Sequence, residues 1–230
     1  NCYVVANNPF GRATLLAVSS ATPNEAPSVA GRFFMARCTD GGPLDCVWDP
    51  YLRRVLHPTA YRVHEGAPLY TFLVPDGPDP GYRYLAARRV GDPVDLLGPA
   101  GAGFALNARL RSLLLVADVA RAPLLFPLIH EMLDRGGRVT LLVRTPPAAA
   151  PAAAPAAPPP ASPAAAHVDL ILQSLPLAVE ARAEPAATFG DALAELAAWA
   201  DSVCLALEDN DPAAYGDVSS SLRANRPRAV

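Results

Sequence analysis

The hydrophobic pattern of the chain changes its period near residue 112, and this change divides the sequence into two parts. Before it, short runs rich in Val, Leu, Tyr and Phe alternate with turn-forming segments about every ten residues, as in a small antiparallel barrel or sandwich. After it, continuous apolar runs alternate with apolar positions at helical spacing, as in a parallel sheet covered by helices. The pattern therefore predicts a β-barrel followed by an α/β domain.

The first part is predicted to hold five strands, a short helix and a closing strand. The strands are Cys2–Val5, Ala13–Ser19, Phe33–Cys38, Ala60–His64 and Leu69–Val74. The segments between them, such as Asp-Gly-Pro-Asp-Pro-Gly, are rich in turn residues. A helix is expected at Tyr84–Arg89 and the closing strand at Val94–Leu97. We assign residues 1–97 to the barrel and the glycine-punctuated residues 98–111 to a connecting turn.

The second part is predicted to alternate strands and helices over residues 112–218, followed by a polar, Arg-rich tail at 219–230. The predicted order is strand Leu113–Val116, helix Pro123–Arg135, strand Arg138–Val143, helix Val168–Leu175, strand Ala178–Ala183, helix Gly190–Ala200 and strand Ser202–Leu207. An insertion at residues 146–166 contains eight prolines in 21 residues. Because proline stops helix propagation, we expect this insertion to be a disordered surface loop.

Composition narrows the function classes. A net charge of −3 gives no reason to expect nucleic acid or an anionic membrane as a partner. The apolar runs are shorter than the roughly 18–20 residues of a membrane helix, so a cytoplasmic protein is expected. All 19 basic residues are Arg, which removes Lys as a Schiff-base or phosphate-binding residue. Cys2, Cys38, Cys46 and Cys204 match no zinc or iron–sulfur spacing, and we interpret them as buried thiols with no metal site.

Four segments together resemble the ferredoxin–NADP reductase superfamily, and within it the electron-transfer subunit of heteromeric dihydroorotate dehydrogenase. Gly31–Cys38 resembles that family's Pro-Gly-Gln-Phe-x-Met-x-Arg-Cys strand, and Leu52–Leu56 resembles its Leu-x-Arg-Pro-Leu-Ser flavin motif. Gly98–Phe104 resembles the Gly-Pro-Leu-Gly-Asn-Gly-Phe turn, and Ala122–Leu124 resembles the end of a glycine-rich nicotinamide motif closing in Ala-Pro-Leu.

The resemblance implies an oxidoreductase of the pyrimidine-biosynthesis type that holds FAD in the barrel and relays electrons between a pyridine nucleotide and a catalytic flavoprotein subunit. No side chain is expected to act as an acid or base, because the flavin carries the chemistry. The 2Fe-2S cluster of the family needs a cysteine cluster that this chain lacks, so either the chain is cut before it or the protein has none. The implied cofactor-binding residues are Arg53, Arg54, Leu56, His57, Thr59, Leu73, Val74, Gly81, Tyr82, Arg83, Gly98, Pro99, Ala122 and Pro123.

Three places in the flavin-binding half leave alternatives open. Arg53 and Arg54 can place a guanidinium on the flavin pyrophosphate or on the flavin ring edge, and we favour Arg54 as the ligand, with a solvated strand end as the alternative. His57 stands where the family has a small hydroxyl. Either Thr59 takes that role in a shifted register, or the flavin site is altered, or His57 belongs to a surface turn. Gly81 and Tyr82 stand where a Gly-x-Gly-Thr segment opens a helix, whose N–H groups would hold the diphosphate. Tyr82 or Tyr84 either stacks on adenine or packs in the protein.

The segment Ala117–Arg121 replaces the family's glycine cluster. Glycines let a pyrophosphate approach the backbone, whereas Ala and Val fill that space and Asp118 adds a negative charge. Arg121 offsets that charge only in part, and the segment therefore disfavours ordinary NAD(H) binding. Cys204 either lies beside a nicotinamide or is a packed thiol. A second functional hypothesis follows from these departures, namely a non-catalytic, degenerate homologue that acts as an interaction or regulatory subunit.

Overall fold

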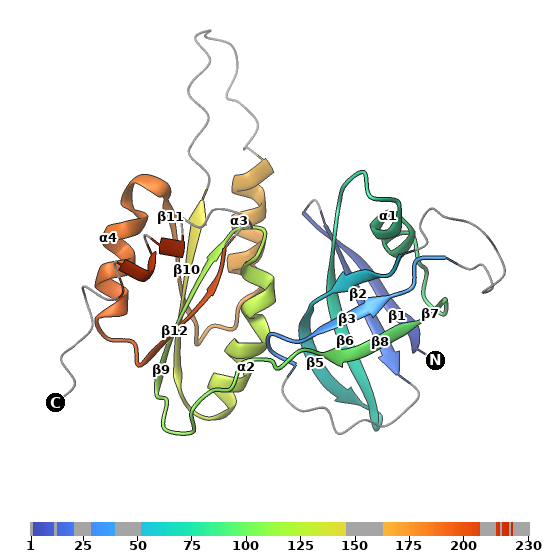
Figure 1. Cartoon of the computed structure of the whole chain (residues 1–230), viewed down its shortest axis with the longest axis horizontal. Coiled ribbons are helices and arrows are strands. Elements are labelled where there is room, and N and C mark those ends of the chain that lie inside the picture. The colour runs from blue at the N-terminus through green and yellow to red at the C-terminus, as the bar shows by residue number, and fades with distance from the viewer. Residues whose placement is uncertain are drawn as a thin grey trace, which may run out of the picture. The chain divides into compact units, whose positions relative to one another are not determined.

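The computed structural model describes residues 2–11, 13–20, 29–39, 52–145 and 163–207, together with residues 215, 216, 218–220 and 222. The chain divides into two compact units, Asn1–Ala105 and Leu106–Val230, and each is described by itself (Figure 1). Among the described helices, none is both long and apolar enough to cross a membrane. Cys46 and most of the predicted insertion, residues 146–162, lie outside the described residues.

Two antiparallel sheets form the first unit. One has the strand order β5-β6-β2-β1-β7 and the other β4-β3-β8. The strands are β1 (Cys2–Phe10), β2 (Ala13–Ser20), β3 (Phe33–Ala36), β4 (Arg54–Leu56), β5 (Pro58–His64), β6 (Ala67–Pro75), β7 (Pro93–Val94) and β8 (Leu96–Ala100). A single residue, His57, links β4 to β5, and a single residue, Asp95, links β7 to β8. The chain thus passes directly from one sheet into the other at two corners, which closes the sheets into a barrel.

The barrel core is built from the inward-facing residues of both sheets. Phe34 of the smaller sheet lies against Tyr70 and Phe72 of the larger one, with ring centroids 4.8 and 5.3 Å apart. Along β2 the buried positions Leu16 and Val18 alternate with half-exposed neighbours, as a strand with one face on the core requires. Predicting strands from runs rich in Val, Leu, Tyr and Phe therefore worked in this half of the chain.

Several predicted elements of this unit were wrong in extent, and one strand was missed. Strand β1 continues to Phe10, five residues beyond its predicted end at Val5, and β4 was not predicted. The helix is α1 (Pro80–Ala86), four residues before the predicted start at Tyr84, because Asp79 caps it and Pro80 begins its first turn. The closing strand is two strands, β7 and β8, and β8 continues to Ala100, beyond the predicted end of the barrel at residue 97. The division between the units, at Ala105 and Leu106, falls within residues 98–111.

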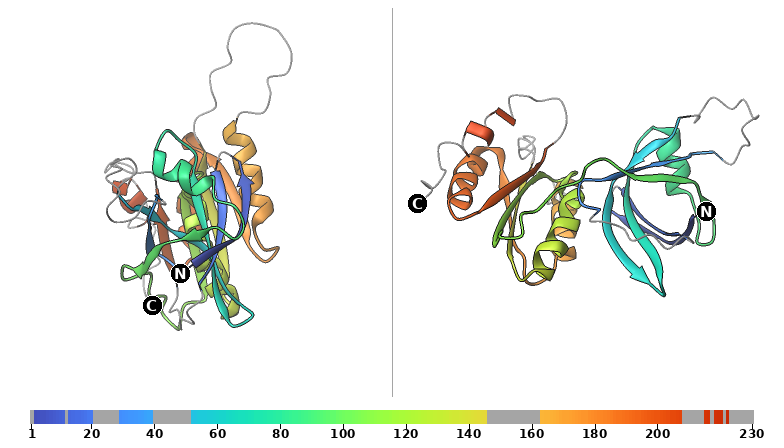
Figure 2. Two further views of the ribbon diagram at one scale, coloured as in Figure 1. Left: turned by 90° about the vertical axis from the view of Figure 1, so that its right-hand side faces the viewer. Right: turned by 60° about the horizontal axis from the view of Figure 1, so that its bottom comes forward.

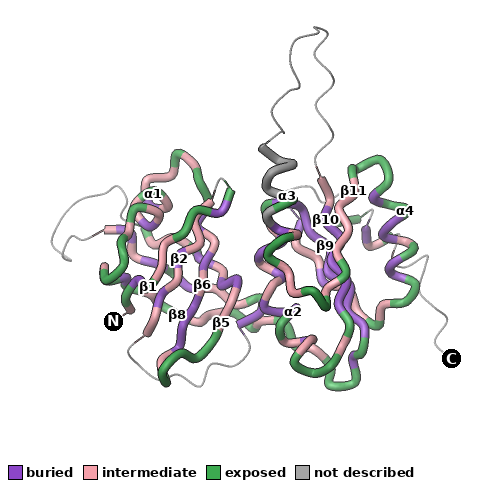
Figure 3. Tube along the Cα trace, turned by 180° about the vertical axis from the view of Figure 1, so that it is seen from behind, coloured by how far each residue is buried: buried purple, intermediate pink, exposed green. Residues whose placement is uncertain are grey.

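The second unit is a parallel sheet of order β11-β10-β9-β12, covered on both faces. Its elements are β9 (Ser112–Asp118), the 3-10 helix η1 (Ala122–Leu125), α2 (Phe126–Asp134), β10 (Arg138–Thr145), α3 (Pro163–Ser174), β11 (Glu180–Pro185), α4 (Ala186–Ala197) and β12 (Ser202–Ala206). Helix α4 covers one face, while α2 and α3 cover the other (Figure 1, Figure 2). Every residue of β9 is buried, and β9 and β10 form the buried centre of the unit (Figure 3).

The fold class predicted from the sequence, a barrel followed by a parallel α/β domain, is confirmed. The predicted loop at residues 146–166 is wrong at its end, since α3 already begins at Pro163. Proline fits the first turn of a helix, and three alanines follow it. The predicted tail is wrong at its start, because residues 219, 220 and 222 are helical.

Gly98 in β8 gives a test of how tightly the barrel is closed. Gly98 has φ of +150°, and an added Cβ would lie 2.7 Å from Cδ1 of Phe34. We expect Gly98→Ala to lower the free energy of unfolding by about 2–4 kcal/mol, through backbone strain and this clash. Gly91→Ala is the control, because Gly91 also has positive φ, +91°, but nothing within 4 Å of an added Cβ. It should cost only about 1 kcal/mol in urea unfolding. Equal losses would contradict the tight closure.

Candidate functional site

The N-terminus of α1 and the start of β4 meet at one carboxylate. Asp79 caps α1, and its Oδ1 accepts hydrogen bonds from the N–H groups of Gly81 at 2.8 Å and Tyr82 at 3.0 Å. Arg54 of β4 donates from Nε to both oxygens of the same carboxylate, at 2.9 and 3.0 Å. The predicted residues Arg54, Gly81 and Tyr82 are thus brought together by an acidic residue that was not among the predicted ones.

Gly81 is what allows the arginine to come so close. A Cβ on Gly81 would lie 2.8 Å from both Cγ and Nε of Arg54, so any larger residue would displace the arginine side chain. The hydrogen bond from Arg54, opposed by partial burial, holds the pKa of Asp79 below its usual value, and the same bond raises the pKa of Arg54. Both groups are therefore charged at neutral pH, and the site is a cationic cradle that holds a carboxylate.

Arg53, the neighbouring predicted residue, has a different role. It pairs with Asp95 at 2.6 Å and donates to the carbonyl oxygens of Met35 and Asp95, each at 3.2 Å. These contacts tie the beginning of β4 to β3 and to the corner between β7 and β8. Arg53 is therefore engaged in holding the smaller sheet together, whereas Arg54 reaches the N-terminus of α1.

The residues around the corner between β4 and β5 have defined contacts within the barrel. The side chain of Leu56 is 1% exposed and packs in the barrel core, and His57 lies edge-on to Phe33 with centroids 6.3 Å apart. Thr59 is 3% exposed, and its hydroxyl donates to the carbonyl oxygen of Thr71 at 3.2 Å. The Thr59 hydroxyl therefore has a partner inside the barrel, and its role beside a flavin stays a prediction.

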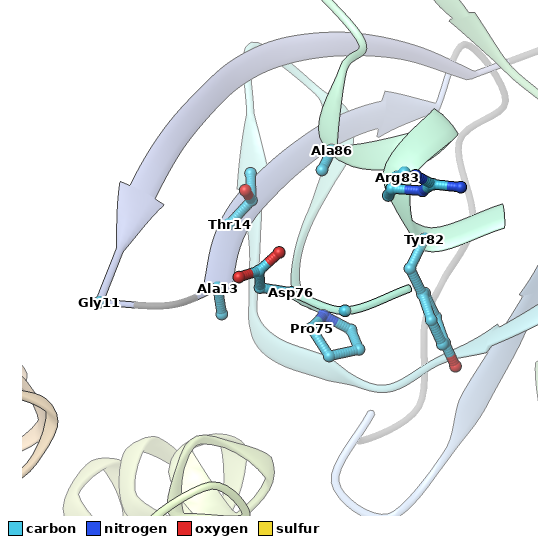
Figure 4. Close-up of a pocket in the computed structure, with 9 residues that line it drawn as sticks. Gly11, Ala13, Thr14, Pro75, Asp76, Tyr82, Arg83 and Ala86 are labelled. Carbon is cyan, nitrogen blue, oxygen red and sulfur yellow. The ribbon is translucent and has the colours of Figure 1, made fainter. Parts of the chain in front are cut away.

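A pocket of about 230 Å³ opens beside α1 (Figure 4). Tyr82 and Arg83 line it together with Thr14 and Asp76, and the Arg83 guanidinium points away from Asp76 (Figure 4). The Tyr82 hydroxyl donates to the carbonyl oxygen of Val55 at 3.2 Å. The remaining predicted residues of β6 lie nearby in sequence, Val74 buried in the core and Leu73 half-buried. The pocket therefore places Tyr82 and Arg83, two of the predicted residues, in the same lining as the carboxylate of Asp76.

The other predicted residues lie on β8 and in the second unit. Gly98 and Pro99 are in β8, and the peptide bond between them is cis. Ala122 and Pro123 are buried in η1. Cys204 is 8% exposed on β12, and burial raises the pKa of its thiol to about 11. A thiol that stays protonated at neutral pH agrees with the packed alternative for this residue.

Comparison with known proteins finds a sequence match over a short segment and structural matches over nearly the whole chain. No family model matches the chain. Over 62 residues the chain is 44% identical to the electron transfer subunit of dihydroorotate dehydrogenase B (NAD(+)) of Shouchella clausii, a match that covers 26% of this chain and 24% of that protein. The chain thus spans about a quarter of the curated relative that it matches.

Solved structures match over nearly the whole chain. The ferredoxin reductase of carbazole 1,9a-dioxygenase superposes with a TM-score of 0.67 at 15% identity, covering 99% of this chain and 66% of that one. Its FAD apo form gives 0.63 at 16% identity, over 99% and 64%. A cytochrome P450 reductase of Amycolatopsis gives 0.59 at 15% identity, over 98% and 65%. The chain has the ferredoxin–NADP reductase fold. The resemblance stated from the sequence motifs is confirmed.

Within this reductase fold, the residues present can be tested against FAD. The Arg54 guanidinium and the N–H groups of Gly81 and Tyr82 are suitable donors for phosphate oxygens, and Gly81 leaves the space that a Cβ would fill. The carboxylate of Asp79 occupies these donors as a stand-in anion. The donor set therefore fits a diphosphate, but a diphosphate has to compete with Asp79.

Sequence reasoning missed Asp79, although a signal was present. The tripeptide Asp79-Pro80-Gly81 was interpreted as turn chemistry, yet Asp followed by Pro is also a helix start, with Asp as the cap and Pro in the first turn. The turn and the helix start give the Asp79 carboxylate different roles. As a cap it faces the free N–H groups, which is where a bound anion would also lie.

Asp79 generates a prediction for stability. We expect Asp79→Ala to lower the free energy of unfolding by about 1–2 kcal/mol at neutral pH, because it removes both the cap and the ion pair. Asp79→Asn, which keeps a capping oxygen, should cost less than about 1 kcal/mol.

The pH dependence of the free energy of unfolding separates the ion pair of Asp79 from its capping of α1. A carboxyl whose pKa is lowered by folding stabilises the protein above its unfolded pKa, about 3.9, and loses this effect as the pH falls through the folded value. The difference between wild type and Asp79→Asn should therefore shrink below about pH 4 in urea unfolding series. A difference that stays constant down to about pH 2 would show that the ion pair does not contribute.

Proposed function

We propose that this chain is a flavin-dependent electron-transfer protein whose first unit holds FAD. The observation that carries the proposal is the meeting of Arg54 with the N–H groups of Gly81 and Tyr82, in a cradle that only glycine leaves open. The proposal is supported by the name of the curated relative, an electron transfer subunit, and by the reductases that share the fold.

In this proposal the residues of the chain bind and orient. Arg54, Gly81 and Tyr82 hold the diphosphate, and the Arg53–Asp95 pair keeps β4 in place beside β3. FAD, when bound, supplies the electron carrier. His57 and Leu56 stand where the resemblance places the flavin ring, and Leu56 is itself buried in the barrel core. The protein that exchanges electrons with this chain carries a redox cofactor of its own. The name of the curated relative, an electron transfer subunit, implies that its own partner is the rest of a dihydroorotate dehydrogenase.

The second candidate function is a non-catalytic homologue that keeps the fold as an interaction or regulatory subunit. It is favoured by the Asp79 carboxylate, which gives the cradle an anion of its own without any ligand. The visible spectrum of the purified protein separates the two candidates. Flavin bands that are released on denaturation support electron transfer, whereas a colourless protein that cannot be reconstituted with FAD supports the second candidate.

Variants of the cradle make the test specific. We expect Arg54→Ala to weaken FAD binding roughly tenfold to a hundredfold, because a charged hydrogen-bond donor to the diphosphate is lost. Asp79→Asn should tighten FAD binding, since it removes the competing negative charge. Arg53→Ala is the matched control, an equal loss of charge one residue away, and should change FAD affinity less than either.

The affinities are measured by adding flavin-free protein to FAD and following the quenching of FAD fluorescence. Thermal unfolding of each variant shows whether it is folded. If Arg53→Ala and Arg54→Ala weaken FAD binding equally, the cradle is not where the diphosphate lies. If Asp79→Asn weakens binding, Asp79 is a positive determinant of the site and the competition is wrong.

A further inference from the structure

The strand order of the second unit marks one position where this architecture takes a dinucleotide. The chain runs from β9 to β10 and β11 on one side, and then returns to β12 on the other side of β9. In an open parallel sheet, ligands bind outside the carboxyl ends of the strands at such a switch point. A glycine-rich turn after the first strand normally lets the pyrophosphate approach the following helix. In this unit both the switch point and the turn after the first strand lie at the carboxyl end of β9.

An ion pair occupies the end of β9. Asp118 is the last residue of β9, and Arg144 stands directly opposite in the register of β10. Arg144 donates from Nε to Oδ1 at 2.6 Å and from Nη2 to Oδ2 at 3.0 Å, a two-pronged contact. The guanidinium also lies over the ring of Phe189, at 5.8 Å from its centroid. Asp118 is only 7% exposed, so the carboxylate is held inside the strand ends.

The turn after Asp118 is closed by side chains. Val119 and Ala122 are 8% and 0% exposed, so their side chains fill the space that glycines would leave empty. The N–H of Arg121 donates to the carbonyl oxygen of Asp118 at 2.9 Å. Pro123 and Pro127 carry no N–H, so the η1–α2 segment presents fewer donors than an ordinary helix start. The backbone here offers an anion little space and few partners.

We propose that the Asp118–Arg144 ion pair is a specificity-determining element that keeps NADH and NADPH out of the second unit. A pyrophosphate at the strand end would meet the negative charge of Asp118. It could recruit Arg144 only by leaving that buried carboxylate without its cation, which is strongly unfavourable. The exclusion of the nucleotide does not depend on the proposed function. Only its consequence rests on that function: electrons then reach the flavin from a redox group that is not a pyridine nucleotide.

The experiment measures nucleotide binding on flavin-free protein, so that its result does not depend on FAD. ADP-ribose, which carries the pyrophosphate but no nicotinamide, and NADH are titrated into the intact chain by calorimetry. Wild type should show no saturable binding up to about 5 mM. Asp118→Asn should bind ADP-ribose at least tenfold more tightly, because the repulsion is gone and Arg144 is released to the ligand. Asp134→Asn, an equal change of charge at the exposed end of α2, should behave as wild type.

Every outcome decides the matter. Saturable ADP-ribose binding by wild type with a Kd below about 5 mM would overturn the exclusion. Wild type and Asp118→Asn both failing to bind would overturn the role assigned to the ion pair. Asp118→Ser repeats the test with a smaller neutral side chain if Asp118→Asn does not fold. Failure of the proposed function shows separately, as a protein without flavin bands, whatever the nucleotide titrations give.

Discussion

The first unit depends on a single carboxylate shared by three parts of the barrel. Asp79 lies at the beginning of α1, is bound by Arg54 of β4, and follows directly on the connection from β6. A helix of seven residues has too few hydrogen bonds to be stable alone, so its ends must be fixed by the rest of the protein. At the other end of α1, the Asn7 side chain donates to the carbonyl oxygen of Ala86. Between them Leu85 is buried in the barrel core. The helix is therefore held in one orientation before any ligand is present.

Under the proposed function, this arrangement would make FAD binding an exchange of anions. The donors of Arg54, Gly81 and Tyr82 are pre-organised, but they are satisfied by Asp79, so a diphosphate gains only the difference between two sets of similar bonds. Asp79 also competes from within the chain, at a high effective concentration. A diphosphate has the advantage of a larger charge and more acceptor oxygens. The balance between these terms decides whether the barrel holds its ligand firmly or only when the ligand is abundant.

The sequence was sufficient for the architecture but not for the contacts that decide chemistry. The change of hydrophobic period near residue 112 predicted both units, because strands buried on one face and strands buried on both faces leave different patterns. The motif at Leu52–Leu56 and Gly81 correctly selected residues that meet in space. The partner of Asp118, Arg144, lies 26 residues away, and only the register of β9 against β10 brings them together. The partner of the Thr59 hydroxyl, the carbonyl oxygen of Thr71, could not be predicted either, because only the pairing of β5 with β6 brings the two residues together.

Each unit contains an Arg–Asp pair, Arg54–Asp79 in the first and Arg144–Asp118 in the second, and the two pairs are not equivalent. Asp79 has 38% of its side chain exposed, so water can replace Arg54 as the carboxylate swings away. The side chain of Asp118 is 10% exposed, and the same motion would leave it desolvated among buried strands. Opening the first pair therefore costs little, whereas opening the second costs the solvation of a buried charge. The exposure of the two carboxylates thus supports both proposals, a barrel that accepts an anion and an α/β unit that excludes one.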